Sequence, residues 1–359
     1  MADYSTPSLP WWSFAFPAAA LGVFVLYLSL GGGVFLYVVA GALLIGAVFA
    51  SVHHAEVVAH RIGEPYGTIV LAVAVTVIEV ALIVSAMASG GPGAATIARD
   101  TVFAAVMIAC NGIVGLCLLA GGIRHHEQAF RLEGANSALA VLTALTTLTL
   151  VLPNVTTTAP GPSFSPSQLV FAGLVSLVLY GSFVFIQTVR HRDYFLDKHT
   201  PDHGEPPSNG MALVAFGMLL VALTAVVLIA KVLTPTVEAG VRAIGAPYSA
   251  VGIVIAILVL LPEGMAAVRA ARANRVQESL NLALGSALAS IGLTIPTVAA
   301  VSLATGASLT LGLAAKEQIL LALTLLTGLA TLGAGRTTVL QGVIHIVICA
   351  AFVFLAIVP

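Results

Sequence analysis

Residues 71–87 read LAVAVTVIEVALIVSAM, a stretch in which Glu79 is the one charged residue. The stretch is apolar and long enough to form the core of a membrane-spanning helix, which needs about 20 residues. A charged side chain at the centre of a bilayer costs at least about 2.5–3.5 kcal/mol on insertion scales. Because such groups are retained where they face a cavity, a cation or a proton, Glu79 is a candidate functional residue.

The composition of the whole chain supports a membrane protein. The 359 residues are 59% hydrophobic and only 8% charged, whereas a soluble domain carries about 25% charged residues. The lipid bilayer is therefore the expected partner over most of the surface, and the net charge of −1 gives no basic patch for nucleic acid. The three cysteines (Cys110, Cys117 and Cys349) lie inside apolar runs without zinc or redox spacing, so they are interpreted as small core residues. No cofactor is expected, and nothing in the sequence specifies an oligomeric state.

The apolar runs predict an all-α polytopic membrane protein with eleven transmembrane helices. They lie at about 12–30, 33–52, 66–88, 101–121, 135–153, 168–188, 211–231, 246–267, 279–302, 313–333 and 338–358. The first run follows no basic residue and no convincing cleavage site, so residues 1–31 are expected to be a retained extra helix.

The basic residues predict the orientation. Eleven spans place ten basic residues on one side of the membrane (Arg61, Arg124, Arg131, Arg190, Arg192, Lys198, Arg269, Arg272, Arg275 and Arg336) and four on the other (Arg99, Lys231, Arg242 and Lys316). Basic loops stay cytoplasmic. The protein is therefore expected in the cytoplasmic (inner) membrane with its N-terminus inside and its C-terminus outside.

An internal repeat divides the chain. GEPY at 63–66 is followed after twelve residues by Glu79, and GAPY at 245–248 is followed after fourteen residues by Glu263. The two glutamates fall on the second helix of two five-helix sets, 32–188 and 211–359, joined by a polar cytoplasmic linker at 189–210. Because five is odd, the sets have opposite orientation, and inverted repeats with polar groups at mid-membrane are typical of secondary transporters.

Two carboxylates at mid-membrane can hold a cation or take protons in its place. Carboxylate oxygens are hard ligands that suit calcium and sodium. Since protons and cation exclude each other at one site, the pair Glu79 and Glu263 predicts a cation/proton antiporter rather than an enzyme.

The motifs around both glutamates resemble the calcium/proton exchanger family of the cation/calcium exchanger superfamily. GEPYGTIVLAVAVTVIEVALI at 63–83 is similar to its entry and first motif, and LLPEGMAAVRAARANRVQESLNLALGSALASIG at 260–292 is similar to its second motif. The first stretch looks most like the bacterial branch of calcium, or sodium and potassium, proton antiporters of the ChaA type. The resemblance implies that Glu79 and Glu263 bind the transported cation and protons, with Asn111 and Ser286 at positions of the family's supporting residues.

The sequence also departs from the family pattern. Val75-Thr76 and Val259-Leu260 replace the Gly-Asn pairs before the two glutamates, and Ala289 replaces a glutamine. Calcium prefers six to eight oxygens, so the loss of these ligands makes Na⁺ or K⁺ an alternative to Ca²⁺. Thr76 still offers a hydroxyl one turn before Glu79. Pro262 and Pro296 remove backbone donors and are expected to open their helices locally.

Several of these residues have a simpler interpretation. A lone membrane glutamate can be a protonated helix-packing group, and Thr76, Asn111 and Ser286 can be packing hydrogen bonds. Glu56 and Glu278 are secondary acidic candidates near predicted cytoplasmic helix ends, where they either balance charge or line a vestibule. The loop histidines and the acidic linker residues Asp193, Asp197, Asp202 and Glu205 are read as solvated, with pH sensing or regulation as the alternative.

Two other functions stay open at this point. A cation channel would also place acids in the membrane. An intramembrane metalloprotease would need His-Glu-x-x-His on a helix, but HHEQAF has Phe130 where the second histidine belongs.

Overall fold

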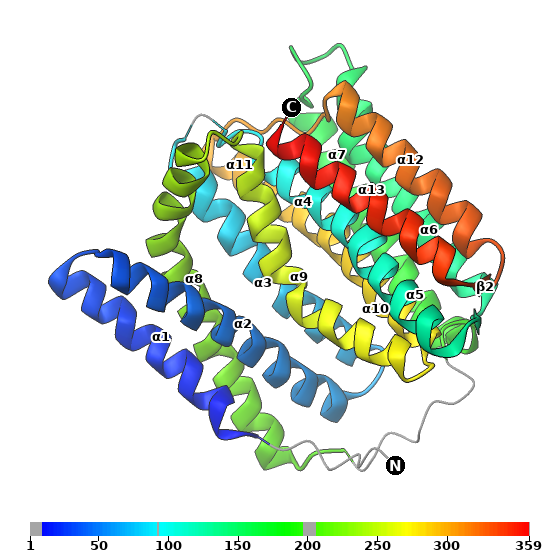
Figure 1. The fold of residues 1–359 in the computed structure, drawn as a ribbon. Helices are drawn as coiled ribbons and strands as arrows, with labels where there is room; N and C mark the ends of the chain where they lie inside the picture. Colours follow the sequence, from blue (N-terminus) through cyan, green and yellow to red (C-terminus); the bar gives the residue numbers. More distant parts are fainter. Residues whose placement is uncertain (1–8, 92, 197–205, 359) are drawn as a thin grey trace. The chain divides into compact units, whose positions relative to one another are not determined.

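The eleven predicted spans are present in the computed structural model, which describes residues 9–91, 93–196 and 206–358 (Figure 1). Seven spans within these ranges are single α-helices: α1 (Trp11–Leu30), α2 (Val34–Ile62), α3 (Tyr66–Ala88), α8 (Asn209–Ala243), α9 (Ser249–Arg272), α12 (Ala315–Leu332) and α13 (Val339–Ile357). All seven are apolar and long enough to cross a bilayer.

The other four spans contain a π-helical or 3₁₀ segment. They are α4 (Ile97–Met107) with η1 (Ile108–Ile113) and α5 (Val114–His125); α6 (Leu132–Thr146) with η2 (Thr147–Val151) and η3 (Leu152–Asn154); α7 (Pro166–Phe185) with η4 (Ile186–Arg190); and α10 (Val276–Ala289) with η6 (Ser290–Thr294) and α11 (Ile295–Thr305). A short 3₁₀ turn, η5 (Arg192–Tyr194), follows the sixth span. The central part of the predicted linker, 197–205, lies outside the described residues and includes Asp197, Lys198, His199, Asp202, His203 and Glu205.

Two helices are longer than predicted. α2 continues to Ile62 instead of ending near residue 52, and α8 continues to Ala243 instead of ending near residue 231. The apolar run marks only the lipid-facing part of a helix, whereas the helix itself ends at a backbone signal. For α2 that signal is Gly63 at φ +75°, and His60 and Arg61 in the last turn complement the helix dipole. Glu56 is therefore inside α2 and not at its end.

The chain forms two compact units. The first consists of residues 1–89 and 201–240, and the second of residues 90–200 and 241–359. In the first unit, α2 packs against both α1 and α3, and Ala55, Ala74 and Leu219 form a buried apolar cluster of α2, α3 and α8. Small residues make this contact close, as is typical of helix packing in membranes.

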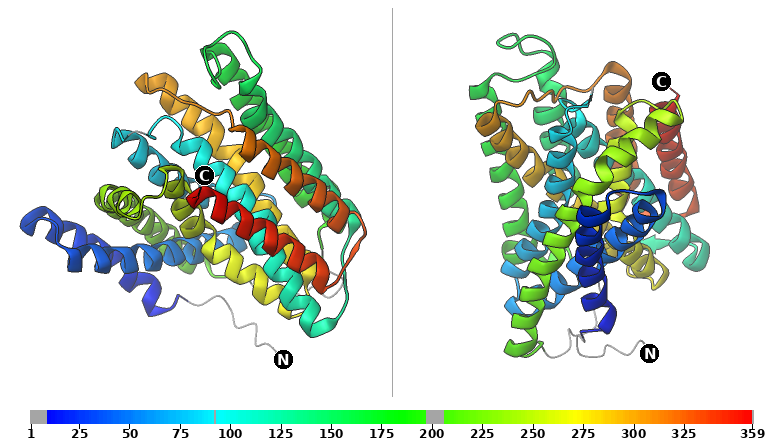
Figure 2. Two further views of the ribbon diagram at one scale, coloured as in Figure 1. Left: turned by 45° about the horizontal axis from the view of Figure 1, so that its top comes forward. Right: turned by 90° about the vertical axis from the view of Figure 1, so that its left-hand side faces the viewer.

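In the second unit α9 is the helix that carries Glu263. It packs against α4, α5 and α10, and α13 packs against α5. Figures 1 and 2 show α12 and α13 side by side. α9 approaches α4 closely at Gly252, where a Cβ atom would lie 2.8 Å from the backbone of Asp100 and of Thr101.

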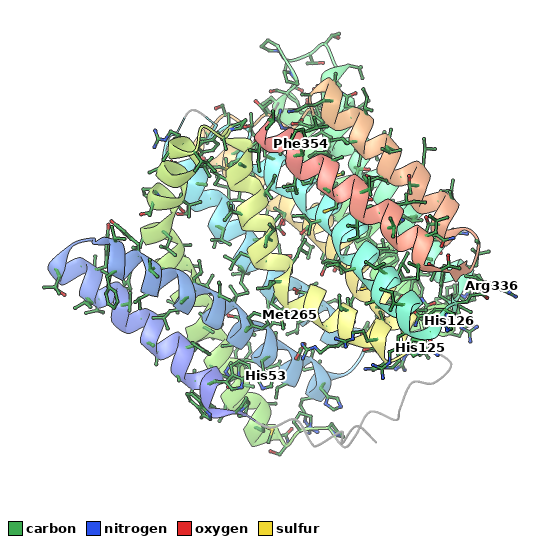
Figure 3. All side chains as sticks on the ribbon, in the orientation of Figure 1. His53, His125, His126, Met265, Arg336 and Phe354 are labelled. Carbon is green, nitrogen blue, oxygen red and sulfur yellow. The ribbon has the colours of Figure 1, made fainter. Side chains whose placement is uncertain are left out.

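Contacts between the loops of the second unit agree with the predicted alternation of spans. β1 (Gln128–Ala129) pairs antiparallel with β2 (Arg336–Thr337), and His125 Nε2 lies 3.0 Å from the carbonyl oxygen of Arg272. All three loops fall on the predicted cytoplasmic side. Figure 3 places His125, His126 and Arg336 at one end of this unit and Phe354 of α13 at the other.

The opposite ends of the helices are joined in the same way. Thr310 N–H donates to Ala95 O (2.8 Å), and Gly312 N–H donates to Pro162 O (2.9 Å). These bonds join three loops that the eleven-span count places on the predicted outer side. One span too many or too few between two of these loops would put them on opposite sides of the bilayer, so the contacts support the count of spans between residues 95 and 336.

The orientation itself can be tested with single cysteines in exposed loop positions. A membrane-impermeant maleimide added to intact spheroplasts should label Thr157→Cys, because the loop after the fifth span is expected to face outward. It should leave Glu127→Cys unlabelled until the cells are lysed. The parent protein with Cys110, Cys117 and Cys349 replaced by alanine is the control, and the reverse labelling pattern would invert the topology.

Candidate cation and proton site

Glu79 lies near the middle of α3 and is buried, with 1% of its surface exposed. The residues around it on the helix, Ile78, Leu82 and Ile83, are also buried. α3 packs against α2 inside the first unit. The structure therefore holds a carboxyl group away from water in an apolar helix, as the sequence predicts.

Thr76 is on the turn before Glu79 and is also buried. Its hydroxyl donates to Ala72 O of the same helix at 2.8 Å. This bond uses the hydroxyl proton and leaves the oxygen lone pairs as acceptors. The arrangement is compatible both with helix packing and with a ligand oxygen, so the supporting role of Thr76 stays a prediction.

Glu263 occupies the equivalent place in the second unit. It is the fifteenth residue of the 24-residue α9, and 8% of its surface is exposed. Val259, Leu260 and Pro262 beside it are buried. α9 continues through Pro262 as one helix, so the local opening expected at this proline does not interrupt the helix.

The two glutamates belong to different units, Glu79 to the first and Glu263 to the second. Each sits near the middle of a helix of similar length, 23 residues for α3 and 24 for α9. This correspondence is what two repeats require. Their meeting at a shared site stays a prediction.

A second correspondence lies in the third helix of each half. The span 97–125 contains the π-segment η1 and the span 276–305 contains the π-segment η6, each near the middle of its span. A π-segment displaces backbone hydrogen bonds and is frequent at functional sites. Pro296 is the second residue of α11, two residues after the end of η6, whereas no proline lies in or beside η1.

Asn111 lies in η1 and is fully buried. Its amide nitrogen donates to Thr324 Oγ1 at 2.9 Å, and its Oδ1 lies 3.0 Å from His345 Nδ1. Neither partner was a candidate in the sequence, because a single histidine in an apolar run near the end of the chain carries no motif. Asn111 is thus tied to α12 and α13, and its role as a ligand stays a prediction.

Ser286 is half-buried on α10, and Ser290 at the start of η6 is buried. Both lie on the span that packs against α9. Ser286 is therefore on the element next to Glu263, while its contact with a cation stays a prediction.

The two secondary acids differ from the central pair in their surroundings. Glu56 is exposed on α2. Glu278 is half-buried and forms an ion pair with Arg275 at 2.7 Å. The ion pair is what the charge-balance interpretation expects for Glu278.

Sequence inspection missed a buried acid at the opposite end of the spans. Asp100 is the fourth residue of α4, which begins at Ile97. The apolar run predicts a start near residue 101, so Asp100 falls outside the predicted span. Its Oδ1 accepts bonds from Arg99 Nε (2.8 Å) and Nη2 (2.7 Å), and its Oδ2 accepts from Thr96 Oγ1 (2.9 Å). Arg99 also donates to Gly312 O at 2.9 Å. Asp100 is thus satisfied by its own turn, and this group joins α4 to the loop before α12.

A second missed acid lies in the first unit. Glu238 is buried near the end of α8, and its Oε1 accepts a hydrogen bond from Ser89 Oγ at 2.6 Å. Glu238 lies beyond residue 231, where the apolar run that predicts the seventh span ends, so the sequence does not indicate that this residue is buried. The bond joins the ends of α3 and α8.

The protease alternative finds no support in the structure. His125 ends α5, His126 has φ +64°, and Gln128 and Ala129 form strand β1. A zinc-binding pair of histidines one turn apart on a helix therefore does not form there. Over the described residues, no three or more His, Cys, Asp or Glu side chains are grouped so that they can hold a metal ion.

The fold and the two repeated glutamate helices agree with the comparison with known families. The model of the sodium/calcium exchanger protein family matches residues 32–189 and 214–358. The chain belongs to the sodium/calcium exchanger family. Its matched segments coincide closely with the two predicted five-helix repeats, and the protein is a multi-pass membrane cation exchanger without a cofactor, not an enzyme.

Individual proteins are similar to this exchanger in sequence or in structure. It is 52% identical over 360 residues to the putative ionic transporter y4hA of Sinorhizobium fredii, with 98% of this chain and 97% of the relative covered. It is 35% identical over 316 residues to the sodium-potassium/proton antiporter ChaA of Escherichia coli, with 86% and 85% covered. The solved structure of native YfkE shares the fold with a TM-score of 0.76 at 18% identity, covering 97% of this exchanger and all of that chain. The match to ChaA confirms the resemblance to the ChaA-type branch of cation/proton antiporters.

The close contact of α4 and α9 gives a test of the packing beside Glu263. Gly252→Ala adds a methyl group 2.8 Å from the backbone of Asp100 and Thr101, so the helices must separate. We expect a loss of about 1–3 kcal/mol in the free energy of unfolding, seen as a lower Tm in detergent. Gly181→Ala on α7 is the matched control, because its Cβ meets nothing within 4 Å. Equal Tm values for the two variants would contradict the packing described for α9.

Proposed function

We propose that this exchanger is a cation/proton antiporter in which Glu79 and Glu263 are the shared ligands of the transported cation and the protons. Protons enter the cell down their gradient and a cation, Ca²⁺, Na⁺ or K⁺, leaves the cytoplasm. The observation that carries the proposal is the repeated placement of one buried carboxyl group near the middle of the second helix of each half.

The coupling follows from competition for the same oxygens. A carboxylate in an apolar helix is stable when a cation or a proton neutralises it, and it is costly when neither is bound. The site therefore changes its access from one side of the membrane to the other only when the two carboxylates hold a cation or protons. Because one partner must leave before the other binds, movement of the two is linked in opposite directions.

The choice of cation depends on how many oxygens surround the pair. Positions 75–76 and 259–260 supply one hydroxyl, that of Thr76, and Ala289 supplies none. A monovalent cation tolerates such a site better than Ca²⁺, which takes six to eight oxygens. The 35% identical relative from Escherichia coli, a sodium-potassium/proton antiporter, supports the same choice. A calcium role is supported by the shared fold with YfkE, which another solved structure describes as a Ca²⁺/H⁺ antiporter.

The sharpest test replaces each carboxylate by its amide. Glu79→Gln and Glu263→Gln keep size and hydrogen bonding but remove the charge and the titratable proton. We expect cation uptake driven by an imposed pH gradient in proteoliposomes to fall to background in both variants. If the two carboxyl groups only packed helices, glutamine would replace them and transport would survive.

Two sets of variants serve as controls for this test. Glu79→Asp and Glu263→Asp retain the charge but shorten its reach by one methylene, so weak exchange or altered selectivity is expected. Glu56→Gln and Glu278→Gln should retain exchange, with at most a moved pH optimum, because Glu56 is exposed and Glu278 is paired with Arg275. Thermal unfolding in detergent confirms that each variant inserts and folds.

Electrical measurements separate the antiporter from a channel and set the stoichiometry. Exchange of two protons for Ca²⁺, or of one proton for Na⁺ or K⁺, moves no net charge, so uptake should not respond to membrane potential. A potential acts with about 2.3 kcal/mol per charge per 100 mV, which makes net charge movement easy to detect. Cation flux in proteoliposomes that follows the potential and ignores the pH gradient would establish a channel instead.

A further inference from the structure

Four polar side chains form a buried network inside the second unit. His345 of α13, Asn111 of η1, and Thr324 and Thr331 of α12 are each exposed by 5% or less. Asn111 bonds to Thr324 and His345, and His345 Nε2 lies 3.2 Å from Thr331 Oγ1. The network joins three spans at a depth where a polar group without a partner is costly.

The hydrogen-bond directions in this network follow from one end. Thr324 Oγ1 donates to Leu320 O at 2.8 Å, so its oxygen accepts the bond from Asn111 Nδ2. Asn111 Oδ1 must then accept from His345, which places the ring proton on Nδ1. Nε2 of the neutral ring accepts from Thr331. Both nitrogens of the neutral ring then have a partner, and the imidazole needs no charge.

The helix of His345 also packs directly against the same π-segment. A Cβ at Gly112 of η1 would lie 3.2 Å from Cys349 Sγ of α13. A π-segment shifts the helical hydrogen-bond ladder and leaves backbone groups that need other partners. His345 therefore bonds to η1 through the side chain of Asn111, and the helix that carries His345 packs against this segment.

The π-segment in turn lies against the helix of Glu263. α9 packs against η1, and a Cβ at Gly264 would lie 3.3 Å from the side chain of Ile113, the last residue of η1. Gly264 is the residue next to Glu263. A shift of η1 is thus transmitted to α9 beside the carboxyl group.

We infer that His345 is a positioning residue of the exchanger: as a neutral donor it fixes η1, and through η1 it fixes the part of α9 that carries Glu263. The inference rests on the proposed function of Glu263. It assigns His345 no contact with the cation and no part in carrying protons. Thr324 acts together with His345, because Thr324 Oγ1 accepts the hydrogen bond that Asn111 Nδ2 donates.

Two amide replacements separate the ends of the imidazole ring. His345→Asn puts an N–H donor near the place of Nδ1 and keeps the bond to Asn111. His345→Gln puts its amide near the place of Nε2 and loses that bond. We expect the cation KM of His345→Asn to stay within about twofold of the wild type, and that of His345→Gln to rise about tenfold, the change that one lost buried hydrogen bond produces. Thr324→Val should raise KM in the same direction.

The pH profile and hydrogen exchange complete the experiment. The pH profile of His345→Asn, which has no titratable ring, should match the wild type. Amide hydrogen exchange of peptides covering residues 106–116 should be faster in His345→Gln than in the wild type and unchanged in His345→Asn. This second measurement needs no transport, so it decides the role of His345 even if the proposed exchange fails in the wild type.

Three results would overturn the inference. One is equal KM and equal hydrogen exchange in the Asn and Gln variants, because the Nδ1 end would then be irrelevant. Another is a shifted pH profile in His345→Asn, which would make the ring a proton carrier. The third is a Tm loss shared by both variants with no difference in exchange of residues 106–116, which would leave His345 as a general core residue.

Discussion

The lack of water inside the bilayer is the constraint on which this structure depends. Each backbone N–H and C=O group must find a partner within the protein, and helices satisfy that demand over eleven spans. The same demand applies to side chains. Four buried polar side chains find their partners in one another across three spans: Asn111, His345, Thr324 and Thr331. Thr76 answers it by bonding to its own helix. A carboxyl group in such surroundings is stable only with a cation or a proton, and that is the physical basis of exchange.

Close helix packing is the means by which the second unit places its polar groups. α9 approaches α4 at Gly252 and η1 at Gly264, positions where a side chain would meet backbone or a buried isoleucine. Glu263 lies one residue from the second of these contacts. Small residues thus allow the close packing of α9 at both positions. The ion pair of Arg99 and Asp100 lies instead at the helix end, where it joins α4 to the loop before α12.

Membership in the sodium/calcium exchanger family accounts for the plan of the chain, although the sequence departs from the family's motifs beside the two glutamates. The family segments match both halves, while Thr76 is the polar residue left where the motif would offer asparagine. The network of His345 joins the π-segment η1, in the third helix of the first half, to α12 and α13. The π-segments in both third helices are a shared feature of the two halves.

The sequence by itself determined the number of spans, the bounds of α3 and the two central glutamates. A bilayer requires long apolar runs, and each charge inside such a run is costly. Both the spans and the two glutamates can therefore be recognised in the amino-acid sequence alone. The tertiary structure decided where α2 and α8 end, because helix ends depend on backbone signals such as Gly63 beyond the apolar run. It alone revealed η1, the bond of Glu238 to Ser89 and the partners of Asn111. His345 is 234 residues away from Asn111, and no local pattern connects two polar residues that only the packing of separate helices brings into contact.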